Sequence, residues 1–213
     1  MQRILLCILI IMILLTGLVC AETAKNKPNE GKPQEAPEWF IKGQQALSTG
    51  NHDEAIQCFT KSKELDPSFA NAYYFLGKAY SMKGMLDDAV NEYKKAIAIA
   101  PKAAITYAEL GGIYIKKGML DEAMKMCEKA IAIDNSNAVA HFNIGYIYNK
   151  RGNNSLAAKH LYRAGLLYLQ LNDKNSALEA YNYLQQTNAT SLEQSLYKKI
   201  YPEKKQKKSG ASK

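Results

Sequence analysis

Residues 73–84 read YYFLGKAYSMKG, and similar stretches follow at intervals of 34 residues: YAELGGIYIKKG at 107–118 and HFNIGYIYNKRG at 141–152. Each stretch carries glycine at its fifth and twelfth positions, and both glycine columns begin earlier, at Gly43 and Gly50. The same period governs a column of alanines: Ala55, Ala89, Ala123 and Ala157. A fixed period of this length is typical of a repeat protein, in which one supersecondary unit recurs along the chain.

Each unit is predicted to be a pair of helices joined by a tight turn. In the second unit Tyr73, Leu76 and Tyr80 recur at helical spacing. Gly84 follows them, and a glycine at this point favours a left-handed residue that ends the helix. Because a unit this short cannot bury its apolar face alone, neighbouring units are expected to stack into a continuous core.

Other columns mark where helices meet, begin and end. Antiparallel helices can approach closely at the first glycine column and at a column of small residues: Ser62, Ala96, Ala130 and Ala164. Pro67 and Pro101 lie at unit boundaries, where proline ends the second helix. An acidic column lies near the start of each second helix, where carboxylates are expected to cap free backbone N–H groups: Asp53, Asp87 and Asp121.

The units resemble tetratricopeptide repeats. In the first unit the resemblance is carried by Trp39, Gly43, Ala46, Ala55, Phe59 and Pro67, and in the second by Tyr73, Leu76, Gly77, Tyr80, Ala89 and Tyr93. It implies an all-α, right-handed solenoid of antiparallel helix pairs, capped by C-terminal helices. The expected domain spans residues 36–200, with units at 36–69, 70–103, 104–137 and 138–171, followed by a degenerate fifth unit and a cap.

The period changes after the fourth unit, because Gly165 follows Gly145 by only 20 residues. One segment therefore fits both the second helix of unit four and the first helix of unit five. We expect a single long helix over 155–171, a turn at Asn172-Asp173, a helix over 174–186 and a capping helix over 191–200.

The N-terminal residues have the pattern of a secretory signal. A basic start precedes twelve apolar residues, Ile4 to Leu15, and small residues lead to a predicted cleavage between Ala21 and Glu22. Two alternatives remain open: an uncleaved membrane anchor over residues 4–21, or a lipidated Cys20. All three export the body, so the protein is expected to be periplasmic or secreted, or else anchored and facing outside the cytoplasm.

Charge is concentrated in the C-terminal tail. The formal net charge is +8, and residues 198–213 contain seven lysines against one acid, Glu203. We expect residues 22–35 to be a flexible linker and residues 201–213 to be a basic disordered tail. Residues 203–213 have no aromatic residue among their lysines, and the body is expected to be exported, so nucleic-acid binding is not expected.

The sequence predicts no enzyme, no cofactor and no metal site. It has no phosphate-binding glycine loop and none of the motifs typical of zinc hydrolases or serine nucleophiles. His141 and His160 are expected to approach each other, but two imidazoles without a third ligand make a poor metal site. Cys58 and Cys127 lie two repeats apart, too far for a disulfide.

The resemblance also implies a concave groove, lined by the first helix of each unit, along which a partner segment lies. The groove-facing candidates are Phe40, Gln44, Asn71, Tyr74, Lys78, Ala108, Gly112, Ile115, Lys116, Phe142, Tyr146, Asn149 and Lys150. The family's clamp for chaperone carboxylates is absent, since its five positions hold Phe40, Gln44, Phe75, Ile105 and Glu109. The aromatic candidates suggest apolar anchors for a peptide or helix, unless they pack between helices.

Two functions follow from these expectations. The first is an exported, non-catalytic interaction module that binds a protein partner in its groove, with contact to a membrane only through residues 4–21 if they are retained or lipidated. The second is a membrane-anchored scaffold that assembles an envelope complex. A mature chain beginning at Glu22 favours the first, and a retained Met1 or a lipidated Cys20 favours the second.

Overall fold

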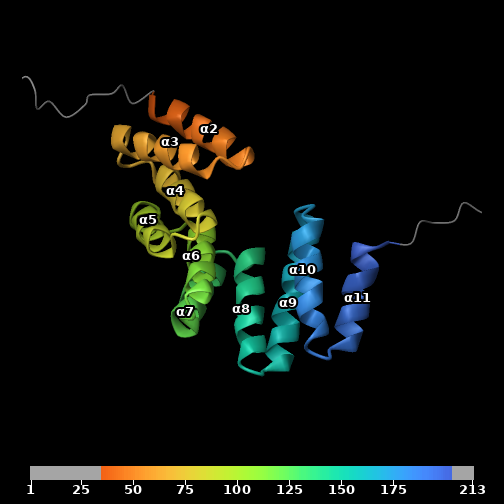
Figure 1. Ribbon diagram of the computed structural model, residues 1–213. Coiled ribbons are helices and arrows are strands. Elements are labelled where there is room, and N and C mark those ends of the chain that lie inside the picture. Colours follow the sequence, from red (N-terminus) through yellow and green to blue (C-terminus); the bar gives the residue numbers. More distant parts are fainter. Residues whose placement is uncertain (1–34, 203–213) are drawn as a thin grey trace, which may run out of the picture.

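The computed structural model describes residues 35–202, and the predicted signal, most of the linker and most of the tail lie outside this range. The described chain is built from ten helices and contains no strand (Figure 1). They are α2 (Glu35–Ser48), α3 (His52–Leu65), α4 (Ala70–Met82), α5 (Leu86–Ile99), α6 (Ala104–Lys116), α7 (Leu120–Ile133), α8 (Ala138–Lys150), α9 (Asn154–Gln170), α10 (Lys174–Gln185) and α11 (Thr190–Ile200).

The helices form successive pairs, and each pair packs on the next along the chain (Figure 1). The pairs are α2/α3, α4/α5, α6/α7 and α8/α9, as the 34-residue period predicts. The expectation of an all-α solenoid of helix pairs is confirmed. Among the helices of residues 35–202, none combines the length and apolar character needed to cross a bilayer.

The second glycine column ends the first helix of each unit, as predicted. Gly84 has a φ of +77°, and the equivalent glycines of the other three units lie within two degrees of it. Only glycine adopts this left-handed conformation without steric cost from a Cβ. Asn172 has the same role after α9, with a φ of 59°, so the turn expected at Asn172-Asp173 is present.

The first glycine column allows the two helices of a unit to touch. A Cβ added to Gly111 would lie 2.5 Å from Sγ of Cys127, and one added to Gly145 would lie 2.7 Å from Cγ of Leu161. These contacts join α6 to α7 and α8 to α9. Glycine is therefore required at these positions by close approach rather than by backbone conformation.

The acidic column lies at the helix starts, as predicted, but its carboxylates also form ion pairs that were not predicted from the sequence. Asp53, Asp87 and Asp121 lie in the first turns of α3, α5 and α7, but α5 and α7 have no side-chain cap hydrogen bond. Their carboxylates instead pair with a basic residue that follows the first helix of the next unit: Lys83, Lys117 and Arg151, respectively. The side chains of these aspartates are at least 74% exposed, so each pair contributes little to stability.

The C-terminal end departs from the regular repeat. The long helix expected over 155–171 is α9, which packs against α8, α10 and α11. Gly165 of α9 is covered by Leu196 of α11, whose side chain is fully buried. In unit four, Gly145 is covered by Leu161 from the second helix of the same unit. At Gly165 the capping helix α11 provides the covering residue instead.

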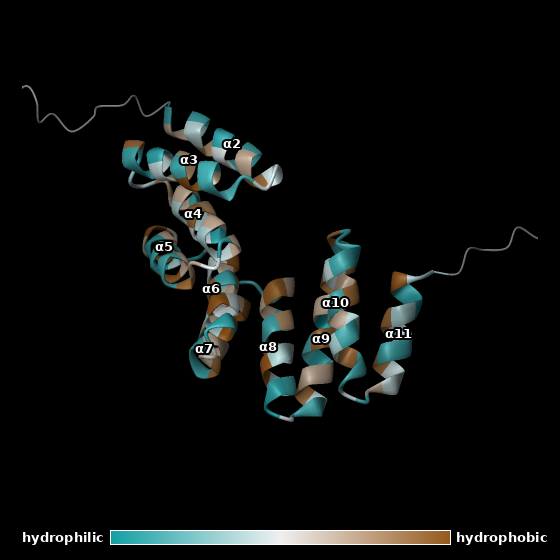
Figure 2. Cartoon of the chain, in the orientation of Figure 1, coloured by the Kyte–Doolittle hydropathy of each residue, from teal (hydrophilic) through white to brown (hydrophobic). Residues whose placement is uncertain are grey.

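Burial is greatest in the middle of the solenoid. Eight of the 13 residues of α6 are buried, against three of the 14 residues of α2. Apolar and polar bands alternate along the helices in Figure 2, with prominent apolar bands on α6 and α8. The first helices of units three and four are therefore enclosed by neighbours on both sides, which leaves few positions on them for a partner to reach.

Candidate functional site

The aromatic candidate of the first unit belongs to the core. The ring of Phe40 lies 5.7 Å from that of Phe59, 5.0 Å from that of Phe69 and 5.2 Å from that of Phe75, measured between centroids. Phe40 is only partly buried, but its neighbours come from α3, from α4 and from Phe69 directly before α4. Its ring therefore joins the first two units, while Gln44 one turn later is exposed.

The candidates of units two and three meet around a carboxylate. Glu109 of α6 is partly buried. Burial raises the pKa of Glu109, and the positive charges of Lys78 and Lys116 act against that rise. Lys116 also donates a hydrogen bond to Oγ of Ser81, at 3.3 Å. We name Tyr74, Lys78, Glu109 and Lys116 the Glu109 cluster.

The charge of Glu109 affects the pKa of tyrosines on three helices. Burial, with a smaller contribution from the charge of Glu109, raises the pKa of Tyr74, Tyr93 and Tyr168. Tyr74 also packs against the ring of Tyr93 at 5.7 Å. The Glu109 cluster is therefore joined to α5 through the contact between Tyr74 and Tyr93. Asn71, the remaining candidate of unit two, is exposed in the first turn of α4.

Three candidates of unit three contribute to packing. Ala108 has no exposed surface, and its backbone carbonyl accepts a hydrogen bond from Nδ2 of Asn143 at 3.0 Å. Gly112 lies against the same amide, and Ile115 packs on the central core. The expectation that Ala108 faces an open groove is wrong, because α8 covers this side of α6.

The candidates of unit four form a second cluster, with α10. The rings of Phe142 and Tyr146 meet that of Tyr183 edge-on, at centroid distances of 5.6 Å and 5.4 Å. The ammonium group of Lys150 lies 5.4 Å from the centre of the Tyr146 ring. Nδ2 of Asn149 donates to Oε1 of Gln186 at 3.0 Å. We name these residues the α8–α10 cluster: Phe142, Tyr146, Asn149, Lys150, Tyr183 and Gln186.

The structure thus gathers most of the predicted site residues into two clusters, and it adds residues that the repeat pattern does not indicate. Glu109 fills a position of the absent chaperone clamp, which was its only signal in the sequence. Tyr183 and Gln186 lie after the period breaks, so no column identifies them.

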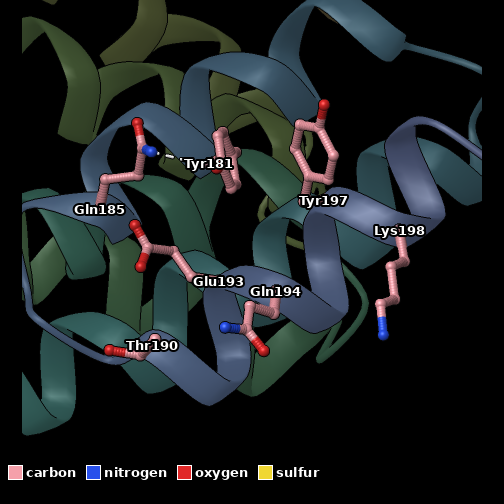
Figure 3. A pocket seen from close by; sticks show the side chains of 7 residues that line it. All are labelled: Tyr181, Gln185, Thr190, Glu193, Gln194, Tyr197 and Lys198. Carbon is pink, nitrogen blue, oxygen red and sulfur yellow. Dashed lines mark hydrogen bonds between the residues drawn. The ribbon is translucent and has the colours of Figure 1, made fainter.

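A cavity of about 310 Å³ lies between α10 and α11. Figure 3 shows the rings of Tyr181 and Tyr197 side by side at one end, with Glu193 below them and Lys198 directed away. Nε2 of Gln185 donates to the hydroxyl of Tyr181 at 3.0 Å. The lining is polar and aromatic.

A larger cavity of about 520 Å³ lies where α7, α8 and α9 meet, and two histidines line it. Nδ1 of His141 lies 3.1 Å from Nδ1 of His160, so the expected approach of the two rings is confirmed. Nε2 of His141 lies 3.1 Å from the carbonyl oxygen of Asn135. Within residues 35–202, no group of three or more metal-binding side chains is present.

Neither Cys58 nor Cys127 has the character of a reactive thiol. Cys58 and Cys127 are both buried and unpaired with each other. Burial raises the pKa of Cys58, and it raises that of Cys127 to about 12. A thiol that stays protonated at neutral pH is a poor nucleophile, so both side chains act as small apolar residues.

The histidine pair is expected to make folding stability sensitive to acid. Burial and the charges of His141 and Lys159 lower the pKa of His160 to about 4, and burial lowers that of His141. In the unfolded chain both titrate at about 6.5. Below that value the unfolded state binds more protons, so stability falls as the pH falls from about 6.5 towards 4.

We predict that His160→Gln removes part of this sensitivity. Urea unfolding at pH 7 and pH 5 should show a loss of stability on acidification that is smaller in His160→Gln than in the parent by about 1–2 kcal/mol, a figure reduced for the partial exposure of the ring. His52→Gln, which changes a histidine outside the pair, is the control. Equal acid sensitivity in parent and His160→Gln would contradict the prediction.

These helix pairs, turns and clusters define an α-solenoid built from a 34-residue unit. The chain matches the family described as TPR repeat over residues 43–84, 82–118 and 111–152, and the family described as Tetratricopeptide repeat over residues 161–191. The protein belongs to the tetratricopeptide repeat family. No curated protein sequence matches the chain.

Solved structures share the fold. The crystal structure of MamA is 25% identical, with a TM-score of 0.55 over 78% of this chain and 83% of that chain. TTC0263, described as a thermophilic TPR protein in Thermus thermophilus, is 20% identical, with a TM-score of 0.56 over 78% of this chain and 98% of that one. The first TPR of Spaghetti (RPAP3), bound to the HSP90 peptide SRMEEVD, is 23% identical, with a TM-score of 0.56 over 58% of this chain and 98% of that one.

Proposed function

We propose that this protein is an exported, non-catalytic interaction module that binds an apolar segment of a partner protein, a peptide or a helix, along the first helices of its repeats. The observation that carries the proposal is the α8–α10 cluster, in which Phe142 and Tyr146 remain partly exposed beside Lys150. Aromatic side chains that are held in place and bordered by polar groups are typical anchors of protein interfaces. The solved first TPR of Spaghetti (RPAP3), which is bound to the HSP90 peptide SRMEEVD, supports a peptide-binding role for this fold.

The Glu109 cluster extends the proposed surface towards unit two. It combines the positive charges of Lys78 and Lys116 with the carboxylate of Glu109, which also acts on Tyr74. Lys78 and Lys116 are exposed, so salt screens their attraction for a partner. We therefore assign affinity to the aromatic rings, and rate and orientation of association to the lysines.

The test uses peptides selected from a random displayed library on the purified protein. Tyr146→Ala is expected to weaken a selected peptide by about 30-fold, or roughly 2 kcal/mol, while the melting temperature stays close to that of the parent. Lys150→Ala should weaken it less, and only at low salt. Fluorescence polarisation at two salt concentrations measures the affinity and its salt dependence, and thermal melting measures the stability.

Tyr197→Ala is the matched control, because Tyr197 is an aromatic residue that is 49% exposed on α11. Unchanged affinity in a folded Tyr146→Ala protein would remove the α8–α10 cluster from the site. Weakening by Tyr197→Ala alone would move the site to the cavity between α10 and α11. If Tyr146→Ala lowers stability and binding follows only the folded fraction, the ring has a packing role.

Export is the second part of the proposal, and it rests on residues 1–21 of the sequence. Sequencing the N-terminus of the protein from its native cell tests it. A chain that begins at Glu22 supports the exported module. A retained Met1 or a lipidated Cys20 supports the membrane-anchored scaffold instead.

A further inference from the structure

We propose that the cavity between α7, α8 and α9 is a binding site for a small organic anion, with its apolar body against Ile131 and Leu166 and its acid group held by Lys159 and Arg163. The cavity of about 520 Å³ is made by residues outside both clusters described above. Its size lies within the range of small-molecule sites. The inference is independent of the proposed protein partner.

The lining of this cavity carries positive charge without a carboxylate to balance it. Lys159 and Arg163 line it together with His141 and His160, and no acidic residue is among the lining residues. Within residues 35–202, neither Lys159 nor Arg163 forms an ion pair, whereas Arg151 pairs with Asp121. Lys159 and Arg163 are four residues apart on α9, so they project from one side of that helix.

The hydrogen bonds of the histidine pair involve three of its four ring nitrogens and leave out Nε2 of His160. The carbonyl oxygen of Asn135 can only accept, so Nε2 of His141 carries a proton and donates to it. In the neutral ring, Nδ1 of His141 then accepts from Nδ1–H of His160. Nε2 of His160 remains unprotonated, with no hydrogen-bond partner from residues 35–202. A proton taken up by the pair would bind to Nε2 of His160. The His160 ring, which lines the cavity, could then donate a hydrogen bond to an anion.

The charged groups around the histidine pair are mostly positive, so a bound anion would be attracted to them. From α9, Lys159 adjoins His160 and Arg163 acts on His141, and both lower the pKa of the neighbouring imidazole. Glu128 of α7 lines a second depression, which adjoins the cavity and shares His160 with it. Among the residues that line the cavity or this depression, Glu128 is the one carboxylate. The rings of Tyr148 and Tyr162 complete the surroundings. An acid group bound between Lys159 and Arg163 would favour the protonated pair, so binding and proton uptake should strengthen each other.

A metal ion fits this cavity less well. The two Nδ1 atoms are close enough to share a cation, but the described residues provide no third ligand beside them. The ammonium and guanidinium groups that line the cavity would also repel a cation. Both features favour an anion.

The experiment follows the histidine ring protons of the full-length protein by NMR during titration with octanoate, with octanamide as the uncharged equivalent. Octanoate is expected to produce saturable shifts in His141 and His160, and octanamide none. Lys159→Gln and Arg163→Gln should each weaken octanoate by about tenfold. Both side chains are exposed, so neither change should affect folding. Lys102→Gln, at an exposed turn outside the cavity, should have no effect.

The pH dependence is the second readout. Octanoate should bind several-fold more tightly at pH 5.5 than at pH 7.5, because a bound carboxylate favours the protonated form of the pair and raises its pKa. The proposal is overturned by equal binding of octanamide, by insensitivity to both Lys159→Gln and Arg163→Gln, or by no saturation below about 10 mM. Saturation of the same ring signals by zinc ions, with no response to octanoate, would identify a metal site in its place.

Discussion

Replacement of Gly111 by leucine is expected to lower the free energy of unfolding by about 3 kcal/mol, which corresponds to a fall in melting temperature of roughly 6–12 °C. A Cβ at this position would lie 2.5 Å from Sγ of Cys127 and 3.3 Å from the backbone oxygen of Ala123. The sulfur belongs to a fully buried side chain and the carbonyl to the backbone of α7, so a leucine side chain here should push the two helices apart. Thermal melting and urea unfolding followed by circular dichroism measure the change.

Gly112 gives a matched control on the next residue of the same helix. Its added Cβ would meet only Nδ2 of Asn143, at 3.5 Å, which is an ordinary contact. Gly112→Ala should therefore be neutral or stabilising by up to about 1 kcal/mol, because alanine favours the helix over glycine. If Gly111→Leu melts like the parent, the close contact between α6 and α7 is not formed as described.

The regular part of the fold can be predicted from the sequence because each column reflects a contact within one unit or between adjacent units. Gly84 ends its helix through a backbone conformation, and Gly145 lies against Leu161 at a fixed spacing along the chain. Such local requirements recur with the period, so the period reveals them. The 34-residue columns therefore predict both the helices and the way they pair.

The partners of charged residues are harder to predict. Asp87 near the start of α5 is compatible with a helix cap, with an interaction with the helix dipole or with an ion pair, and all three require the same residue type. The structure shows the pair with Lys117, which lies 30 residues further along the chain. A second column of basic residues, at Lys83, Lys117 and Arg151, was the signal in the sequence that could have indicated it.

The candidate site is predicted only in part, since it depends on the surface between units. The family register places Phe142 and Tyr146 on one face, but Tyr183 comes from α10, where the period has already changed. Ala108 has the same register position as residues that face outward in other units, yet α8 covers it here through Asn143. Such contacts depend on how far one unit is rotated relative to the next, and the 34-residue columns do not predict that rotation.

Substitution of Leu196 by alanine should cost about 2–5 kcal/mol, because this side chain has no exposed surface and fills the space above Gly165. The neighbouring Lys198 is exposed, and Lys198→Ala on the same helix should change stability by less than about 0.5 kcal/mol. Urea unfolding of the two variants separates the loss of a packed side chain from a general effect of changing α11. Equal stability of Leu196→Ala and the parent would show that α11 does not cover the end of the solenoid.

A second substitution makes the contact itself testable. In the parent, a Cβ at Gly165 would lie 2.6 Å from Cδ2 of Leu196, so Gly165→Ala should be destabilising despite the better helix propensity of alanine. In the Leu196→Ala background that atom is gone, and the added methyl group enters the space it leaves. Gly165→Ala should then be neutral or stabilising by up to about 1 kcal/mol. Such a reversal of sign requires that the two side chains compete for one volume, because the effects of distant substitutions simply add.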